Sequence, residues 1–429
     1  MSTIRFRNPH FIQQLDMNLK QFLRLSLSAF FVFQLTASSV SADWPGFLGP
    51  SGNGVLPNAK LPIDFAPSVD GKPAKNIAWR VPIEGRCVGG PIVVGNRVFS
   101  CSGSGMEQRW LSVTCVSADD GKVLWTRKIK TTGRPYSHPT SANSAPTPCT
   151  DGERIFAFFS SNDLVCYDLD GNLQWYRGLV YDHPKTGNDV GMSSSPVVVD
   201  GVVVVQVECQ GDSFAAGIDA VTGETKWEVP RPPKANWSSP SVAVGKDGGK
   251  VVVLQCADNL LAIDPRSGSE AWRIDIKCAT IPTSVSSGGK LFVPSQGIKA
   301  FELTSALVKP EQKWESSRIN PNSCSVLVTD QAVYGVNRSV LVCCDHTGEM
   351  KWQIRLEVSG SVWATPVIAG NYLYSIDQEG NCSTVQLDGA EGKLIATSKL
   401  GAAVLGSPAL TNNAMFIRSI DALWKIAAN

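Results

Sequence analysis

The stretch Val342-Cys343-Cys344-Asp345-His346-Thr347-Gly348-Glu349-Met350-Lys351-Trp352 is one copy of a unit that recurs along most of the chain. Each copy has a small residue, an apolar residue, an Asp, a short turn, a Gly, and a Trp four positions after that Gly. Clear copies are Gly217-Ile218-Asp219 with Gly223 and Trp227, Ala262-Ile263-Asp264 with Gly268 and Trp272, Cys166-Tyr167-Asp168 with Gly171 and Trp175, and Cys115-Val116-Ser117 with Gly121 and Trp125. Degenerate copies are Gln386-Leu387-Asp388 with Gly392 and Ala396, and Ala300-Phe301-Glu302 with Trp314 but no Gly. A fixed period of this kind indicates a repeat fold.

The unit has a plain physical meaning. Residues before the Asp alternate on a strand, the Asp-to-Gly segment turns the chain, and the Trp lies on the next strand. A carboxylate that recurs at the same hairpin is expected to accept hydrogen bonds from turn N–H groups, as Asx-turns do, rather than to bind a metal or act as an acid. The residues concerned are Asp168, Asp219, Asp264, Asp345 and Asp388.

A second marker, a Pro with small or hydroxyl neighbours, runs in step with the first. Its copies are Gly90-Pro91-Ile92, Ala145-Pro146-Thr147, Ser195-Pro196-Val197, Ser239-Pro240-Ser241, Thr365-Pro366-Val367 and Ser407-Pro408-Ala409, with degenerate forms at Pro282-Thr283-Ser284 and Ser323-Cys324-Ser325. Eight starts and eight Trp-type slots predict an all-β, eight-bladed β-propeller of four-stranded antiparallel blades. Because Trp79 precedes the first start, we predict that the N-terminal strand around it completes the last blade and closes the ring, which removes free sheet edges.

The repeat resembles the pyrroloquinoline-quinone-like propeller repeat of quinoprotein alcohol dehydrogenases and of the outer-membrane-assembly propeller lipoprotein. The opening Asp43-Trp44-Pro45-Gly46-Phe47-Leu48-Gly49-Pro50-Ser51-Gly52-Asn53-Gly54 is similar to the start of exported, planctomycete-type members of that family. The resemblance covers residues 43 to 429. It implies the propeller fold and leaves the activity open, because one fold hosts many functions.

The first 42 residues are interpreted as a secretory signal peptide. Lys20 and Arg24 precede an apolar run over residues 25–35, and Val40-Ser41-Ala42 offers a small-residue cleavage site. Met17 is an alternative start, and an uncleaved anchor is an alternative interpretation, although the run is short for a bilayer span. We therefore expect an exported protein, periplasmic or extracellular, with no membrane span after cleavage.

The remainder is expected to contain a Pro- and Gly-rich lead-in segment, residues 43–78, and a single propeller domain, residues 79–429. The 429-residue chain has 43% hydrophobic and 18% charged residues and a net charge of +1. A charge so close to zero gives no support for nucleic acid or an anionic membrane as partner. We expect a monomer.

The twelve cysteines lack the spacing of a zinc site or a haem attachment motif. Quinoprotein alcohol dehydrogenases carry an adjacent-cysteine disulfide over the quinone, and Cys343-Cys344 invites that comparison. The repeat places both residues at ordinary core positions, where free Cys packs as a small hydrophobe. Buried thiols with one or two bridges are the expected pattern, and the connectivity stays open.

Long connections between blades gather on one face around the central channel, where propellers usually bind ligands. Trp237 and Trp363 stand out there because they lie outside the Trp repeat slot. The candidate residues of this ligand or partner face are Arg86, Arg134, His138, Asn143, His183, Asn188, Asp189, Asn236, Trp237, Arg318, Asn322 and Trp363. Alternatively, these loops hydrogen-bond one another and plug the channel.

The favoured hypothesis is a binding or assembly scaffold in the cell envelope, without catalysis of its own, whose partner is an envelope protein or a small ligand. The residues predict no catalytic set, no metal site and no cofactor. The resemblance implies an alternative, an oxidoreductase that uses pyrroloquinoline quinone with calcium, but no motif matches its calcium ligands and catalytic Asp residue by residue. A lyase- or glycan-type enzyme would draw on His138, His183, Tyr136 and Tyr181.

Overall fold

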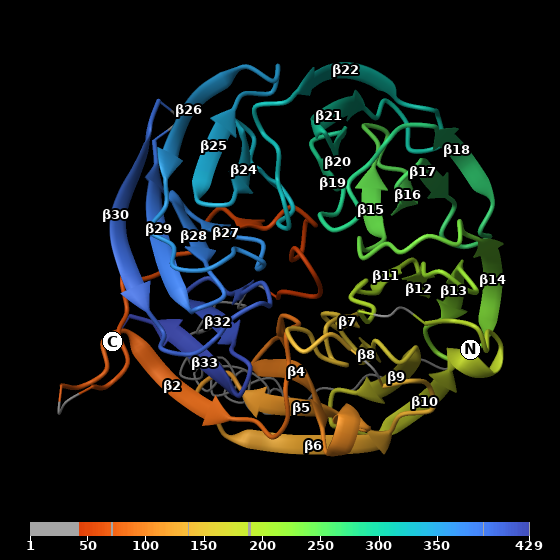
Figure 1. The fold of residues 1–429 in the computed structure, drawn as a ribbon, viewed down its shortest axis with the longest axis horizontal. Coiled ribbons are helices and arrows are strands. Elements are labelled where there is room, and N and C mark those ends of the chain that lie inside the picture. Colours follow the sequence, from red (N-terminus) through yellow and green to blue (C-terminus); the bar gives the residue numbers. More distant parts are fainter. Residues whose placement is uncertain (1–42, 70–71, 136, 188–189, 389, 429) are drawn as a thin grey trace, which may run out of the picture. The chain divides into compact units, whose positions relative to one another are not determined.

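Eight antiparallel sheets surround a central axis in the computed structural model, which describes residues 43–69, 72–135, 137–187, 190–388 and 390–428 (Figure 1). All of these residues belong to one unit, residues 41–429. The region interpreted as a signal peptide lies outside the described residues. The predicted eight-bladed propeller is confirmed.

In blades 1 to 6 the strands follow one another in sequence from the axis outward, so the inner strand begins the blade. The strands of blades 1 to 4 are β3 (Ile92–Val94), β4 (Arg97–Ser104), β5 (Trp110–Ser117) and β6 (Val123–Lys130); β7 (Cys149–Thr150), β8 (Arg154–Phe158), β9 (Asp163–Asp168) and β10 (Leu173–Gly178); β11 (Val197–Val199), β12 (Val202–Val207), β13 (Phe214–Asp219) and β14 (Thr225–Pro230); and β15 (Ser241–Val244), β16 (Lys250–Gln255), β17 (Leu260–Ile263) and β18 (Glu270–Ile274).

Blades 5 to 8 repeat this order, and blade 8 borrows its outer strand from the N-terminal part. Their strands are β19 (Val285–Ser287), β20 (Lys290–Ser295), β21 (Gly297–Glu302) and β22 (Glu311–Ser316); β23 (Leu327–Val328), β24 (Val333–Asn337), β25 (Val340–Cys344) and β26 (Met350–Arg355); β27 (Val367–Ala369), β28 (Tyr372–Ile376), β29 (Asn381–Leu387) and β30 (Gly392–Lys399); and β31 (Ala409–Leu410), β32 (Ala414–Arg418), β33 (Ala422–Ala427) and β2 (Ile77–Pro82). The helical elements of the described residues are two short 3₁₀ turns, η1 (Met106–Gln108) and η2 (Leu179–Tyr181).

Ring closure takes the predicted form. Strand β2 pairs antiparallel with β33 and places Trp79 opposite Lys425 and Val81 opposite Leu423. The outer edge of the last blade is thereby covered by the first long strand of the chain, which protects a sheet edge that would otherwise be free.

The lead-in segment crosses the ring before it reaches β2 (Figure 1). Trp44 exchanges two backbone hydrogen bonds with Val93 in blade 1, and the side-chain amide of Asn53 donates to the carbonyl of Val328 in blade 6. Strand β1 (Val55–Leu56) then pairs parallel with β27, so blade 7 has five strands where four were predicted. The extra strand comes from the lead-in, whose backbone must find hydrogen-bond partners once it is buried.

The repeated Trp and Gly belong to one contact between neighbouring blades. The indole N–H of Trp175 donates to the carbonyl of Ala220 in the next blade's turn, at 3.1 Å, and a Cβ on Gly223 would lie 2.7 Å from the same indole. Gly223 also has φ +75°, a conformation that favours glycine. Trp79, Trp125, Trp227 and Trp314 each make the equivalent bond to the following blade. The unit therefore encodes an interface between blades as well as a hairpin.

The repeat Asp residues act as the sequence predicts. Asp219 accepts hydrogen bonds from the backbone N–H groups of Val221 and Thr222, both at 3.0 Å. Those bonds, that of Thr222 above all, lower the pKa of Asp219. The degenerate copy in blade 7 needs a correction: Ala396 lies opposite Thr384, not Gln386, because β29 and β30 pair closer to the turn, up to Leu387 opposite Gly392, than the corresponding strands of blade 3 do.

Replacing Gly223 by Ala is expected to destabilise the protein by about 1 to 2 kcal/mol for the left-handed conformation alone. A further loss follows because Trp175 must move. Gly201 supplies a matched control, since it has φ +77° and open space where a Cβ would lie. Urea denaturation of Gly223→Ala and Gly201→Ala measures the difference. Equal losses would mean that the Trp175 contact contributes nothing.

Candidate functional site

A ring of side-chain hydroxyls encircles the axis at the beginning of the inner strands. In every blade the ring position stands two residues before the first residue of the inner strand. In blades 1 to 7 the backbone N–H of the ring residue donates to the hydroxyl oxygen of the next blade's ring residue. The seven accepting residues are Thr147, Ser195, Ser239, Thr283, Ser325, Thr365 and Ser407, with N···O distances of 2.9 to 3.0 Å. The second sequence marker therefore encodes a chain of bonds that joins all eight blades.

The ring positions differ from the first marker residue in blades 2, 5 and 6, and in blades 5 and 6 they are the second and third residues of the degenerate markers, Thr283 and Ser325. In blade 2 the ring residue is Thr147, followed by Pro148, so the marker falls two residues later than Ala145-Pro146. In blade 1 the position is Gly90, where a Cβ would lie 2.5 Å from the carbonyl oxygen of Ser407. A side chain does not fit at the seam where blade 8 meets blade 1, and the ring carries seven hydroxyls for that reason.

Above the ring lies a cavity of about 440 Å³. Trp237, Trp363 and Ile281 form part of its wall, and Trp363 is 42% exposed. All seven ring hydroxyl residues line it as well. Among the described residues the lining contains no Asp, Glu, Asn, Gln, Lys or Arg, and His138 is its one titratable side chain. The cavity is therefore aromatic and aliphatic around its wall and hydroxylic at its base.

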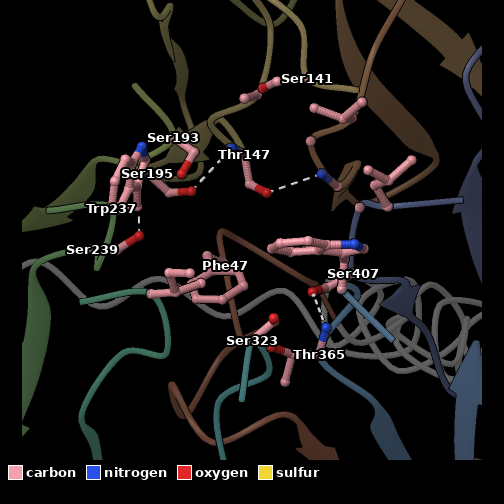
Figure 2. A pocket seen from close by; sticks show the side chains of 18 of the residues that line it. Phe47, Ser141, Thr147, Ser193, Ser195, Trp237, Ser239, Ser323, Thr365 and Ser407 are labelled. Carbon is pink, nitrogen blue, oxygen red and sulfur yellow. Dashed lines mark hydrogen bonds between the residues drawn. The ribbon is translucent and has the colours of Figure 1, made fainter. Parts of the chain in front are cut away.

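Phe47 from the lead-in segment closes the base of this cavity. Figure 2 shows its ring near the centre, with Trp237 and Ser239 on one side and Ser407 on the other. The next residue, Leu48, is buried and has φ +67°, a conformation that costs a non-glycine residue about 1 to 3 kcal/mol. The surrounding contacts hold this backbone, which delivers the Phe47 side chain into the channel.

The structure brings three of the sequence candidates together in the cavity wall: His138, Trp237 and Trp363. The indole N–H of Trp237 donates to the carbonyl of Gly191 at 2.9 Å, which fixes the ring against the preceding connection. His138 Nδ1 is hydrogen-bonded to the hydroxyl of Thr140 at 2.7 Å. These three residues come from connections that enter blades 2, 4 and 7, so ring closure alone makes them neighbours.

Other candidates support the loops instead of facing the cavity. The side-chain oxygen of Asn143 accepts from the N–H of Ser161, and the amide of Asn236 donates to the carbonyl of Gln255. Arg86 Nε donates to the carbonyl of Ser141. His183 stacks on Phe214 with ring centroids 3.8 Å apart and is bonded to Glu228. Buried connections must satisfy their own polar groups, and these side chains do so.

Three further candidates lie apart from the cavity wall. Arg134, Arg318 and Asn322 are exposed and do not line it. Asn188 and Asp189 lie outside the described residues, as does Tyr136.

Sequence reasoning missed the hydroxyl ring, although its signal was present in the Ser and Thr residues of the second marker. It also missed a buried ion pair behind the cavity wall. Arg231 Nε donates to Glu208 Oε1 at 2.5 Å, and each side chain is 1% exposed. Gln206 donates to the same carboxylate oxygen at 2.9 Å. Burial raises the pKa of Glu208, and the guanidinium of Arg231 acts in the opposite direction.

The twelve cysteines carry free thiols, and all except Cys278 are buried. The one or two bridges expected from the sequence are not formed. Cys343 packs beside Trp352 in one core cluster, whereas Cys344 packs beside Phe292 in another, on the opposite face of the blade. The interpretation of this pair as two ordinary core residues is confirmed. Burial raises the pKa of Cys343 to about 12.

Replacing Ser239 by Ala is expected to destabilise the protein by about 1 to 3 kcal/mol, because the buried N–H of Ser195 loses its acceptor. Ser193 lines the same cavity and lies outside the bonded ring, so Ser193→Ala serves as the matched control with little expected loss. Denaturation midpoints of both variants test this. Equal stability of Ser239→Ala and Ser193→Ala would show that the hydrogen bonds of the ring do not stabilise the fold.

Comparison with known proteins agrees with this architecture. The family model described as "Outer membrane protein assembly factor BamB" matches residues 71–211, 185–345 and 337–428. Polyvinylalcohol dehydrogenase of Sphingopyxis sp. (strain 113P3) is 24% identical over 278 residues, which cover 54% of this chain and 39% of that protein. The assembly factor BamB of Moranella endobia (strain PCIT) is 27% identical over 168 residues, 36% of this chain and 43% of that protein. The chain thus matches less than half of the length of either relative.

Two solved structures share the fold. BamB from Moraxella catarrhalis superposes with a TM-score of 0.61 at 16% identity and covers 82% of this chain and 97% of that chain. Quinohemoprotein alcohol dehydrogenase from Comamonas testosteroni superposes with a TM-score of 0.63 at 12% identity and covers 90% of this chain and 80% of that chain. The repeat, the closed ring and the match over residues 71–428 together show that the chain belongs to the family of the outer membrane protein assembly factor BamB, among the quinoprotein-like propellers.

Proposed function

We propose that the protein is an exported binding or assembly propeller of the cell envelope that performs no catalysis of its own. The observation that carries this proposal is the lining of the axial cavity, which is aromatic, aliphatic and hydroxylic and is closed beneath by Phe47. Membership in the BamB family supports an envelope location and a protein partner. No helix among the described residues is both long and apolar enough to cross a membrane.

The alternative, a quinoprotein oxidoreductase, was tested against the donor groups of the cavity. Calcium takes six to eight oxygen ligands, mostly carboxylates and amide carbonyls. Among the described residues the only side-chain oxygens in the cavity lining are hydroxyls, and no cluster of three His, Cys, Asp or Glu could hold a metal ion. Pyrroloquinoline quinone is itself a tricarboxylate, and burying its charges without cationic partners is costly. The described residues do not fit this cofactor, and no reaction step is derived through it.

Titration with pyrroloquinoline quinone and calcium tests the choice between the two functions. Tryptophan fluorescence of the protein is followed, with Trp237→Ala and Trp363→Ala as controls. We expect no saturable, calcium-dependent quenching. Saturable quenching that is lost in either variant would favour the oxidoreductase.

Photo-crosslinking in intact cells tests the scaffold directly. A photoreactive residue replaces Thr140, which is exposed beside the cavity, or Asp330, which is exposed in the turn between β23 and β24 at the other end of the channel. We expect a discrete envelope protein to be crosslinked from position 140 and not from position 330. The absence of a crosslinked protein at both positions would contradict the proposal.

A further inference from the structure

We propose that the axial cavity is the acceptor site for an uncharged aromatic side chain presented by a partner polypeptide. The inference rests on the proposed function and names the chemistry of the partner at that site. Four features of the cavity lead to it: the chemistry of its wall, the occupant that the chain itself supplies, the hydroxyl hydrogens of the ring, and the size of the space.

The wall selects against charge. Trp237 and Trp363 offer indole surfaces, and Ile281 and Val190 are exposed apolar residues at 36% and 39%. Aromatic rings pack against such surfaces in stacked or edge-to-face arrangements. A carboxylate or an ammonium group would be desolvated here without an opposite charge among the described lining residues, which disfavours anionic and cationic ligands.

The chain's own lead-in segment shows which group the hydroxyl ring accepts. Phe47 reaches the ring from one side of the channel, on a backbone that has a glycine on either side, Gly46 before it and Gly49 two positions after it. Gly49 has φ +74°, and a Cβ there would lie 2.7 Å from the indole of Trp44. A benzyl group on a glycine-bounded segment is therefore already seated at the base of the cavity, whose other end is open for a second one.

The ring hydroxyls favour a polypeptide over an isolated aromatic molecule. Each hydroxyl oxygen accepts one backbone N–H, but the structure gives its own hydrogen no acceptor among the described residues. Ser239, Thr283 and Ser325 are 2% to 5% exposed and line the cavity, so these hydrogens are available inside it. Peptide carbonyls are the acceptors that would satisfy them, because a buried donor without a partner is costly. A cavity of about 440 Å³ accommodates a side chain together with its peptide group.

Fluorine NMR of a labelled peptide tests the inference. The probe is acetyl-glycyl-(4-fluorophenylalanyl)-glycinamide, which imitates the sequence around Phe47. We expect it to bind the intact protein, and to be displaced about tenfold less effectively by acetyl-glycyl-glutamyl-glycinamide than by the unlabelled phenylalanyl peptide, because the carboxylate would be desolvated. Equal displacement by the two peptides would overturn the inference.

Two variants locate the binding. Ile281→Asp places a carboxylate in the cavity wall, whereas Val221→Asp places one at a position that is 62% exposed in the turn between β13 and β14 and outside the lining. We expect affinity for the fluorinated peptide to fall about tenfold in Ile281→Asp, since the new carboxylate lies beside the bound ring, and to stay unchanged in Val221→Asp. Unchanged affinity in both would place the peptide elsewhere and contradict the inference.

Two comparisons separate the possible failures. Binding of 4-fluorotoluene as tightly as the peptide would mean that the peptide group contributes nothing, and would overturn the polypeptide partner in favour of a free aromatic ligand. If position 140 crosslinks an envelope protein equally well in the Ile281→Asp background and the peptide does not bind, the proposed function stands and this inference falls. If neither crosslinking nor peptide binding occurs, the proposed function falls with it.

Discussion

The Arg231→Met variant is expected to lose about 3 to 5 kcal/mol of stability, since removal of one partner of a buried ion pair leaves the other charge unpaired. Glu208 would then be a carboxylate in the core with Gln206 as its remaining side-chain donor at that oxygen. Denaturant unfolding of wild type and variant gives the difference.

A surface pair supplies the control for this prediction. Arg273 and Glu270 are bonded at 2.9 Å, with side chains 44% and 48% exposed. The Arg273→Met variant should lose about 0 to 1 kcal/mol, as exposed pairs do. The double variant Glu208→Gln, Arg231→Met should recover much of the loss, because no charge remains buried. If the double variant is as unstable as Arg231→Met, the loss of stability comes from altered packing and not from the unpaired charge.

The loss of unfolding free energy in Arg231→Met, relative to wild type, should also increase as the pH rises. Burial raises the pKa of Glu208, and the loss of the guanidinium removes the opposing influence, so the folded variant binds a proton more tightly than the unfolded chain. A raised pKa in the folded state gives stability that is present at low pH and is lost as pH rises through that pKa. Unfolding of wild type and variant at pH 5 and pH 8 should show the larger difference at pH 8. A larger difference at pH 5 would contradict this account.

Removal of strand β2 is the second change with a large expected effect. A chain that begins at Ile83 leaves β33 with a free edge, and the contacts of Trp79 with the neighbouring blade are lost. Ile77, Trp79 and Val81 are partly buried against the core, and all three are removed together. Loss of one fully buried Trp side chain costs about 3 to 5 kcal/mol, so the combined loss is a large part of the roughly 5 to 15 kcal/mol that stabilises a typical fold. We expect the shortened chain to aggregate, as measured by size-exclusion chromatography.

The same strand supplied at the other end of the chain is the control. Ile77 lies opposite Ile426 in the antiparallel pair, so a short linker after Asn429 can return residues 75–82 to their place. This permuted chain also lacks the lead-in segment, and it differs from the shortened chain only in β2. Recovery of soluble protein would show that the pairing closes the ring. Aggregation of both chains would assign the stability to the lead-in instead.

The fold could be predicted from the sequence because its signals are local and repeated. Asp219, Gly223 and Trp227 lie within one hairpin, and their spacing shows a strand, a turn and a strand without any knowledge of the partners. Repetition of that hairpin predicts a ring of blades packed face to face. Trp79 stands ahead of the first blade, on the strand that completes the last blade. The propeller and its closure follow from these short-range patterns.

The candidate site was predicted less completely because it is assembled from distant residues. Trp237 and Trp363 were recognisable since they fall outside the repeat slot, and both line the cavity. Asn143 and Asn236 have the same polar character but are buried and bonded to loop backbone. Whether a polar side chain faces a cavity or a carbonyl depends on the path of its loop, and composition does not determine that path.

The amino-acid sequence alone therefore determined the number of blades, the hairpin in each blade and the strand that closes the ring. The tertiary structure decided which residues meet across the axis. Phe47 lies in a ring formed by residues as far along the chain as Ser407, and Arg231 pairs with Glu208 from the preceding strands. The Arg231–Glu208 pair forms within one blade, once its strands have paired. Contacts across the ring form only when distant segments meet, as in the bonds of Asn53 with Val328 and of Arg418 with Ser100. A local sequence pattern does not predict such contacts between distant segments.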